Sequence, residues 1–366
     1  MRENTISLTG NEAAALAIAQ ANPQLIAGYP ITPVTEILHI LSQNINNKKM
    51  ISQLILPESE HSAISACLGA SACNMRTATA TASQGLLLMH EVLGVVSGLR
   101  LPVVMIVGNR AVSAPLNIHN DHSDTMAIKD SGWLQFYAES VQEIYDLTLL
   151  AFKLSEDENI NLPIMVCMDG FITTHELNKI KVFDNEFVNE YLPKKTNKNS
   201  LFDFDDPKTM GHLALPKDYQ NLRLKLEQTI KKSKEIIKQE FSSFEHKMNL
   251  IEVYNPLASN FFVCMASACG TIKETLKKDS DWGLLKISVF RPFPNEEIIQ
   301  ILKGKRQVIV LDKSLTLKGN GGHLYEEVRS ALYDQDNRPK IYGEIYGLGG
   351  KPFYPKDIKK IVKKYD

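Results

Sequence analysis

The sequence predicts an α/β protein with a largely parallel sheet, followed by a second, smaller α/β unit. Two apolar runs, residues 101–107 and 162–168, are continuous rather than alternating, which is typical of strands that are covered on both faces of a parallel sheet. Stretches rich in small helix-forming residues alternate with these runs, and such alternation indicates βαβ units. The 366 residues are enough for two or three domains of about 150 residues each.

The first unit begins with a predicted helix and strand. Residues 10–21 are rich in alanine and predict a buried helix with a small-residue face, and residues 25–27 predict a short strand. Pro30 and Pro33 exclude a continuing helix, so a loop follows. The other elements predicted for this unit are a helix near Glu36 that Thr35 caps, a small-residue helix over 60–74, a strand over 76–81, a helix over 86–99, and the two apolar strands.

The character of the chain changes between residues 176 and 250. Lysine, asparagine and aspartate accumulate over 176–220, which predicts irregular connecting structure. Apolar residues over 222–248 recur at steps of three, four and seven, which predicts a long amphipathic helix. A second α/β unit starts near 258, with strands expected over 260–265, 285–289 and 307–311 and a short helix over 356–365. We therefore expect one domain over 1–240 and another over 251–366.

Composition excludes several classes of protein. The chain has 41 basic and 42 acidic residues, a formal net charge of −1, which argues against a nucleic-acid binder because such proteins carry a basic excess. No apolar run approaches the roughly 18 residues of a membrane span, and the polar N-terminus lacks a secretory signal, so we expect a cytoplasmic protein. The five cysteines form no Cys-x-x-Cys pair, so we expect small buried hydrophobic residues and no iron–sulfur cluster or structural zinc in this chain.

Simple ligand motifs are weak or missing. The sequence contains neither a G-x-G-x-x-G fingerprint nor a Walker A motif, so it predicts no phosphate loop of its own. Residues 119–124 hold two histidines and two aspartates, but their spacing matches no metal motif. A hydrogen-bonded corner is the favoured interpretation, and no metal site is predicted in this chain.

Two charged residues occupy positions that favour a binding role. Glu60 lies in the first turn of the small-residue helix, where its neighbours would let a flat ligand approach closely; a solvated helix start is the alternative. Arg110 closely follows the strand over 101–107, at the end where α/β sheets bind ligands. A guanidinium there can hold a carboxylate through paired hydrogen bonds, and a structural role is the alternative.

Several longer motifs together resemble one family. They are residues 28–33 (GYPITP), 58–63 (ESEHSA), 79–85 (TATASQG), 109–118 (NRAVSAPLNI), 120–124 (NDHSD), 169–171 (DGF) followed by His175, 291–294 (RPFP) and 325–329 (YEEVR). These stretches are similar to those of the alpha subunits of pyruvate:ferredoxin oxidoreductases, within the 2-oxoacid:ferredoxin oxidoreductases. Val34, His119 and Lys351 stand where that family often has serine, tryptophan and arginine.

The resemblance implies a fold, a reaction and a set of site residues. It implies a thiamine-diphosphate-binding domain of the pyrimidine type, joined to a domain like the C-terminal domain of transketolase. The implied reaction cleaves a 2-oxoacid on thiamine diphosphate, transfers the acyl group to coenzyme A and passes two electrons to ferredoxin or flavodoxin, as in anaerobic metabolism. By the same resemblance, Glu60 contacts the N1′ atom of the cofactor's pyrimidine and Tyr29 and Pro30 lie against the cofactor. Arg110 and Thr32 would bind the substrate.

The resemblance also implies partners. Beta, gamma and delta subunits would complete the enzyme, with the cofactor's diphosphate and its Mg²⁺ on the beta subunit and the [4Fe-4S] clusters on beta and delta-type subunits. The missing phosphate loop and the missing Cys-x-x-Cys agree with that division. A branched-chain or another 2-oxoacid oxidoreductase is one alternative. A non-catalytic scaffold of the same fold is another, although a scaffold would need none of Thr32, Glu60 and Arg110.

Overall fold

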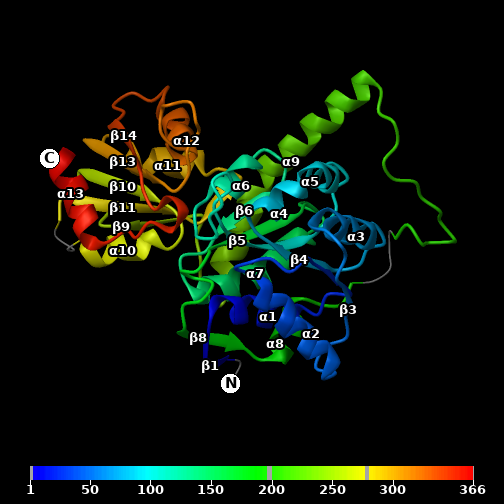
Figure 1. The fold of residues 1–366 in the computed structure, drawn as a ribbon. Coiled ribbons are helices and arrows are strands. Elements are labelled where there is room, and N and C mark those ends of the chain that lie inside the picture. Colours follow the sequence, from blue (N-terminus) through cyan, green and yellow to red (C-terminus); the bar gives the residue numbers. More distant parts are fainter. Residues whose placement is uncertain (1–2, 196–199, 277–279, 366) are drawn as a thin grey trace.

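The computed structural model describes residues 3–195, 200–276 and 280–365, and it confirms an α/β fold built on two parallel-rich sheets (Figure 1). Six strands of the larger sheet run parallel to one another, and a seventh joins one edge in the antiparallel direction. In spatial order the strands are β12 (Val289–Arg291), β6 (Leu134–Tyr137), β7 (Ile164–Asp169), β5 (Val104–Asn109), β4 (Thr77–Thr81), β2 (Leu25–Ala27) and β3 (Gln53–Ile55).

Helices cover both faces of this sheet, which explains its continuous apolar strands. On β5, Val104 and Ile106 join one core cluster, whereas Met105 and Val107 join the other. The first cluster contains residues of α1 (Gly10–Ala21), α2 (Thr35–Asn46), α7 (Val141–Ser155) and α9 (Pro216–Ser243). The second contains residues of α3 (Glu60–Ala72), α4 (Ser83–Leu88), α5 (His90–Gly98) and α6 (Ser123–Ala127).

Local sequence explains how the first helix begins and packs. Thr9 and Glu12 form a capping box at the start of α1, because the Thr9 hydroxyl accepts from the Glu12 backbone and the Glu12 carboxylate accepts from the Thr9 backbone. Ala13, Ala14 and Ala17 are fully buried, so the small-residue face predicted for this helix is confirmed.

The smaller sheet belongs to the second part of the chain. Its strands, in spatial order, are β14 (Lys340–Ile345), β13 (Gln307–Asp312), β10 (Asn260–Cys264), β11 (Trp282–Ile287) and β9 (Ile251–Tyr254). The helices around it are α10 (Ala268–Thr275), α11 (Asn295–Leu302), α12 (His323–Leu332), the short η1 (Leu348–Gly350) and α13 (Pro355–Tyr365). In Figure 1 this part lies beside the larger sheet.

Some predicted elements need correction. The segment over 176–220 is not wholly irregular: it contains β8 (Asn178–Phe183), which pairs with β1 (Glu3–Leu8), and α8 (Asn185–Tyr191). The long helix α9 starts at Pro216 rather than at 222 and ends at Ser243 rather than at 248. Proline is well suited to a first helical turn, where its missing N–H costs no hydrogen bond.

The helix expected over 86–99 is two helices, α4 and α5, with Met89 between them. The helix expected near Glu36 starts at Thr35, so Thr35 belongs to the helix and Val34 precedes it. Strand β12 comes from the second half of the chain but pairs with β6 of the larger sheet. The larger sheet thus includes residues from both predicted domains, and the boundaries 1–240 and 251–366 stay a prediction. No helix among the described residues combines the length and the apolar character needed to cross a bilayer.

Candidate functional site

The candidate site lies along the carboxyl edge of the larger sheet. Parallel strands β2, β3, β4 and β5 all end at this edge, and the loops that follow them carry the predicted residues. Tyr29, Pro30 and Thr32 follow β2, Glu60 begins the helix after β3, and Arg110 comes directly after β5. The carboxyl edge of an open α/β sheet is the usual place for a ligand.

Glu60 is a buried carboxylate without a protein partner in the described part of the chain. It is the first residue of α3, whose N-cap Ser59 accepts a hydrogen bond from the Ser62 backbone. Its side chain is only 8% exposed. Because a buried charge is costly unless it is paired, this carboxylate has unused capacity for a partner from outside the chain.

Gly85, in the first turn of α4, packs closely against the Glu60 side chain. A Cβ atom at position 85 would stand 2.6 Å from Oε1 of Glu60 and 2.7 Å from Oγ1 of Thr81. The Thr81 hydroxyl is buried and has no hydrogen-bond partner among the described residues. The Glu60 carboxylate and the Thr81 hydroxyl thus pack directly against Gly85, and no larger residue fits there without moving them.

Arg110 is tied to the loop after β2. Its Nη1 donates to the carbonyl of Thr32 over 3.1 Å, and its Nε donates to the carbonyl of Asn117 over 3.3 Å. The residue is 8% exposed. An arginine side chain has five N–H donors, so three donors remain without a partner in the residues that the structure describes. The structure therefore brings Arg110 and Thr32 together and leaves donors free for an anion.

Asp124 connects the two loops that carry these groups. It is fully buried, and its Oδ2 accepts from the backbone N–H groups of Ser83 and Arg110, both over 3.0 Å. Its Oδ1 accepts from Nδ2 of Asn109 over 2.9 Å and from the Thr125 backbone over 2.7 Å. Burial raises the pKa of Asp124 to about 6, although these hydrogen bonds oppose the rise. Sequence reasoning missed this role, although Asp124 belongs to the corner over 119–124.

A second buried aspartate joins the two sheets. Asp169, at the end of β7, contacts Nε2 of His122 over 2.8 Å and accepts from Nζ of Lys313 over 2.6 Å. The backbone and hydroxyl of Ser267 also donate to it. Although burial opposes the effect, Lys313 and His122 hold the pKa of Asp169 well below its usual range. The prediction of a hydrogen-bonded corner over 119–124 is confirmed.

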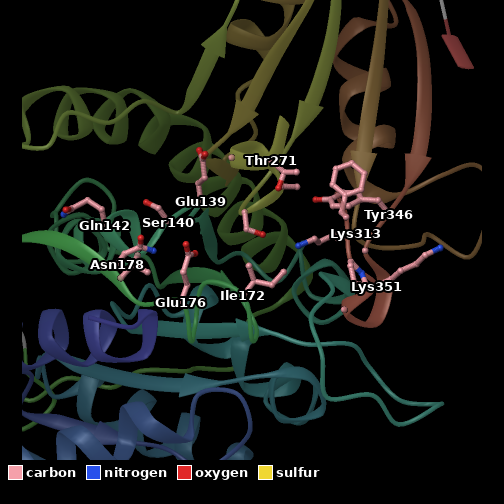
Figure 2. Close-up of a pocket in the computed structure, with 18 of the residues that line it drawn as sticks. Glu139, Ser140, Gln142, Ile172, Glu176, Asn178, Thr271, Lys313, Tyr346 and Lys351 are labelled. Carbon is pink, nitrogen blue, oxygen red and sulfur yellow. The ribbon is translucent and has the colours of Figure 1, made fainter. Parts of the chain in front are cut away.

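Between the two sheets lies a cavity of about 620 Å³, which Figure 2 shows in close-up. Glu139, Ile172 and Glu176 come from the first part of the chain, and Lys313 and Tyr346 come from the second. None of the residues predicted for the site is among the residues that line it. The cavity is therefore distinct from the edge that carries Glu60 and Arg110.

A cluster of three glutamates beside this cavity has the geometry of a metal site but already holds a cation. Oxygen atoms of Glu139, Glu143 and Glu252 lie within 4.8 Å of one another. The fully buried Nζ of Lys286 contacts all three, at 2.9 Å from Glu139 and 3.0 Å from Glu252. Glu139 and Glu143 belong to the first part of the chain, whereas Glu252 on β9 and Lys286 on β11 belong to the second. The ion pairs of Lys286 with Glu139 and Glu143 therefore hold the two parts together.

Not every predicted residue meets the others. Tyr29 is 39% exposed, Pro30 is also exposed, and neither forms a hydrogen bond with Glu60 in the described structure. Thr32 contacts Arg110 through its carbonyl, while its side chain is exposed. The structure thus brings Thr32 and Arg110 together, whereas Glu60, Tyr29 and Pro30 share only the same edge of the sheet with them.

Two family models match the sequence. The model described as pyruvate flavodoxin/ferredoxin oxidoreductase, thiamine diphosphate-binding, covers residues 16–242. The model described as pyruvate:ferredoxin oxidoreductase core domain II covers residues 258–358. Together they account for most of the chain.

Curated relatives match along almost the whole chain. A pyruvate synthase subunit PorA of Methanocaldococcus jannaschii is 43% identical over 97% of this chain and 93% of its own length. The PorA subunit of Pyrococcus furiosus is also 43% identical, over 94% of this chain and 89% of its own length. A ketoisovalerate oxidoreductase subunit VorA of Pyrococcus abyssi is 40% identical over 97% of this chain and 92% of its own length.

Among solved structures, a 2-oxoglutarate:ferredoxin oxidoreductase from Magnetococcus marinus superposes with a TM-score of 0.74 at 18% identity. The match covers 98% of this chain, which spans 65% of the length of that solved chain. This likeness supports the arrangement of the sheets and helices.

Proposed function

This chain belongs to the pyruvate:ferredoxin oxidoreductase family, and on that premise we propose that it is the alpha subunit of a cytoplasmic pyruvate synthase. The proposed reaction removes carbon dioxide from pyruvate, transfers the acetyl group to coenzyme A and passes two electrons to ferredoxin or flavodoxin. The observation that carries the proposal is the buried Glu60 carboxylate without a partner in the described chain, on the same sheet edge as Arg110.

The residues at this edge fit the pyrimidine end of thiamine diphosphate. The Glu60 carboxylate is assigned as the polar partner of the flat ring, and its close packing against Gly85 holds it in place. When bound, the cofactor supplies a nucleophilic carbon for attack on the keto group of the substrate. The role proposed for Glu60 is to hold a protonated ring nitrogen through a charge-assisted hydrogen bond, which also relieves the burial cost of the carboxylate.

The other predicted residues act on the substrate or line the site. The free donors of Arg110 hold the planar carboxylate of pyruvate, while its bonds to Thr32 and Asn117 fix the guanidinium in the loop. The exposed hydroxyl of Thr32 donates to the bound oxoacid. Tyr29 and Pro30 lie on the open side and pack against the cofactor.

Partner subunits complete the enzyme in this proposal. The sequence contains no Walker A motif and no Cys-x-x-Cys, so the diphosphate, its Mg²⁺ and the [4Fe-4S] clusters are assigned to beta and delta-type subunits, with a gamma subunit completing the complex. Coenzyme A is the co-substrate; the solved relative from Magnetococcus marinus carries coenzyme A and succinyl-CoA.

Exposed apolar side chains support a role as one subunit among several. In Figure 1 the first turns of α9 and the segment before it project away from the body of the molecule. Exposed apolar side chains that are concentrated in one projecting segment favour contacts with other proteins. The exposed apolar residues of this arm include Phe202, Phe204, Leu213, Leu215, Tyr219, Leu222 and Leu224.

We expect the isolated chain to be inactive and to bind thiamine diphosphate weakly. The reason is that this chain offers a pocket edge for the pyrimidine but no phosphate loop. Isothermal titration calorimetry on the isolated chain and on the assembled complex measures the difference. Equal affinity in the two samples would contradict the division of the site between subunits.

Replacing Gly85 by alanine should lower turnover of pyruvate by roughly ten- to a hundredfold, because displacing a catalytic group by about 1 Å can cost a hundredfold. The new methyl group would stand 2.6 Å from the Glu60 carboxylate and would force it aside. Steady-state kinetics of the complex gives the effect, and Gly69→Ala is the matched control because a Cβ there meets nothing within 4 Å. Activity at the wild-type level in Gly85→Ala would show that the placement of the Glu60 carboxylate does not affect the reaction.

A branched-chain 2-oxoacid oxidoreductase is the second candidate, favoured by the VorA relative at 40% identity. Pyruvate is preferred because the PorA relatives are somewhat more similar, at 43%. Turnover of pyruvate against 2-oxoisovalerate by the whole complex decides between the two.

A further inference from the structure

A turn of the second part of the chain reaches the loop that carries Arg110. The side-chain amide of Asn117 donates from Nδ2 to the carbonyl of Gly349 over 3.0 Å. Its Oδ1 accepts from the backbone of His119 over 2.7 Å. The carbonyl of the same Asn117 accepts from Nε of Arg110. One residue therefore connects the guanidinium to a turn that lies 232 positions further along the chain.

The contact at Gly349 is too close for any other residue. A Cβ there would stand 2.4 Å from Nδ2 of Asn117, and its φ of +58° lies in the left-handed region that favours glycine. The neighbouring Gly350 has a φ of +82°, and a Cβ there would stand 2.4 Å from Cβ of His119. Two further bonds join the same turn to the loop: Gly349 N–H to Oδ2 of Asp121 over 3.2 Å, and Gly350 N–H to the carbonyl of Asn120 over 2.7 Å.

Hydrogen bonds of Ala111 and Val112 anchor the base of the loop, but its tip is exposed. Residues 113–116 are exposed, and Leu116 is 76% exposed. The loop contains no helix or strand between Arg110 and Asn117. An exposed segment of this kind keeps one conformation only where specific contacts fix it, and Asn117 supplies contacts at both of its polar atoms.

We propose that Asn117 is a positioning residue for the 2-oxoacid carboxylate, and that it acts by clamping the Arg110 loop to the Gly349 turn of the second domain. The inference rests on the proposed function, because it assigns the free donors of Arg110 to the substrate. The backbone carbonyl of Asn117 accepts the hydrogen bond from Nε of Arg110. A fixed position of Asn117 therefore fixes the rotation of the guanidinium plane. The second domain thereby contributes to substrate binding without touching the substrate.

The test uses Asn117→Ala in the assembled complex. The KM for pyruvate and the inhibition constant of oxamate, a planar analogue with the same carboxylate, should both rise about three- to tenfold, which is the scale of neutral hydrogen bonds. The kcat, the KM for coenzyme A and the melting temperature should change little. A fall in melting temperature with an unchanged oxamate constant would overturn the proposal in favour of a structural role.

Two further variants isolate the contact between the domains. Asn117→Asp keeps an acceptor for the His119 backbone but cannot donate to the Gly349 carbonyl, so it should behave like Asn117→Ala. If its KM for pyruvate and its inhibition constant for oxamate equalled those of the wild type, the proposed contact between Asn117 and Gly349 would have no effect on substrate binding. Gly349→Ala should produce the same rise, and it should not add to that of Asn117→Ala. Gly319→Ala is its control, because Gly319 has a φ of +80° but a Cβ there meets nothing within 4 Å.

The wild-type complex separates this inference from the proposed function. If the wild type turns over no 2-oxoacid, the proposed function is wrong. If it turns over pyruvate and neither constant changes in Asn117→Ala, only the clamp is wrong.

Discussion

Replacing Glu60 by glutamine is expected to lower pyruvate turnover by about a hundred- to ten-thousandfold, the usual range for loss of a catalytic proton-transfer partner. The amide has nearly the same shape as the carboxylate, but it cannot hold a protonated ring nitrogen with an opposite charge. Because the Glu60 side chain is buried at the start of α3 and makes no hydrogen bond to another described residue, the complex should still assemble. Exchange of the acidic C2 proton of bound thiamine diphosphate for deuterium reports the effect directly.

Glu58 is the matched control for this experiment. It lies two positions earlier, is exposed, and accepts a hydrogen bond from the Ser62 hydroxyl, which lowers the pKa of Glu58. Glu58→Gln should therefore retain nearly all turnover. If Glu60→Gln exchanged the C2 proton at the wild-type rate, Glu60 would have no role in the chemistry, whatever the loss of turnover.

The strands of the larger sheet and the helices that cover it were predictable where burial of their side chains produces a clear apolar pattern in the sequence. The apolar run over 101–107 predicted β5 because side chains on both of its faces are covered. The alanine-rich run over 10–21 predicted α1 with the same bounds. Strands β8 and β12 were missed because short antiparallel pairings depend on a partner far away in the sequence, and their own residues carry little pattern.

The sequence indicated candidate site residues one at a time. Glu60 stood out because it lies in the first turn of a small-residue helix, Arg110 because it follows a predicted strand, and both because the motifs that surround them are long. Asp124 was assigned to a polar corner, but three of its four bonds reach Ser83, Asn109 and Arg110 and need the folded arrangement. The bond between Asn117 and Gly349 joins residues 232 positions apart, and no local pattern in the sequence indicates such a contact.

Arg110→Lys should raise the KM for pyruvate at least about tenfold, and Arg110→Ala should raise it further. A 2-oxoacid presents a planar carboxylate, which a guanidinium meets with two parallel hydrogen bonds and an ammonium cannot. Charge-assisted bonds of this kind contribute about 1.5–3 kcal/mol, which corresponds to about ten- to more than a hundredfold. Affinity for thiamine diphosphate and for coenzyme A should stay nearly unchanged.

A purely structural role is the alternative for Arg110, because its side chain also holds its own loop through the carbonyls of Thr32 and Asn117. A purely structural arginine would lower the melting temperature or loosen the complex when replaced, and the KM would stay the same. Comparing Arg110→Lys with Asn117→Ala separates the two roles: both variants disturb the loop, but only the first also removes the paired donors. We therefore expect the KM to rise more in Arg110→Lys than in Asn117→Ala at similar melting temperatures. An unchanged KM in Arg110→Lys would assign this residue to the loop alone and leave the substrate carboxylate without its partner in this chain.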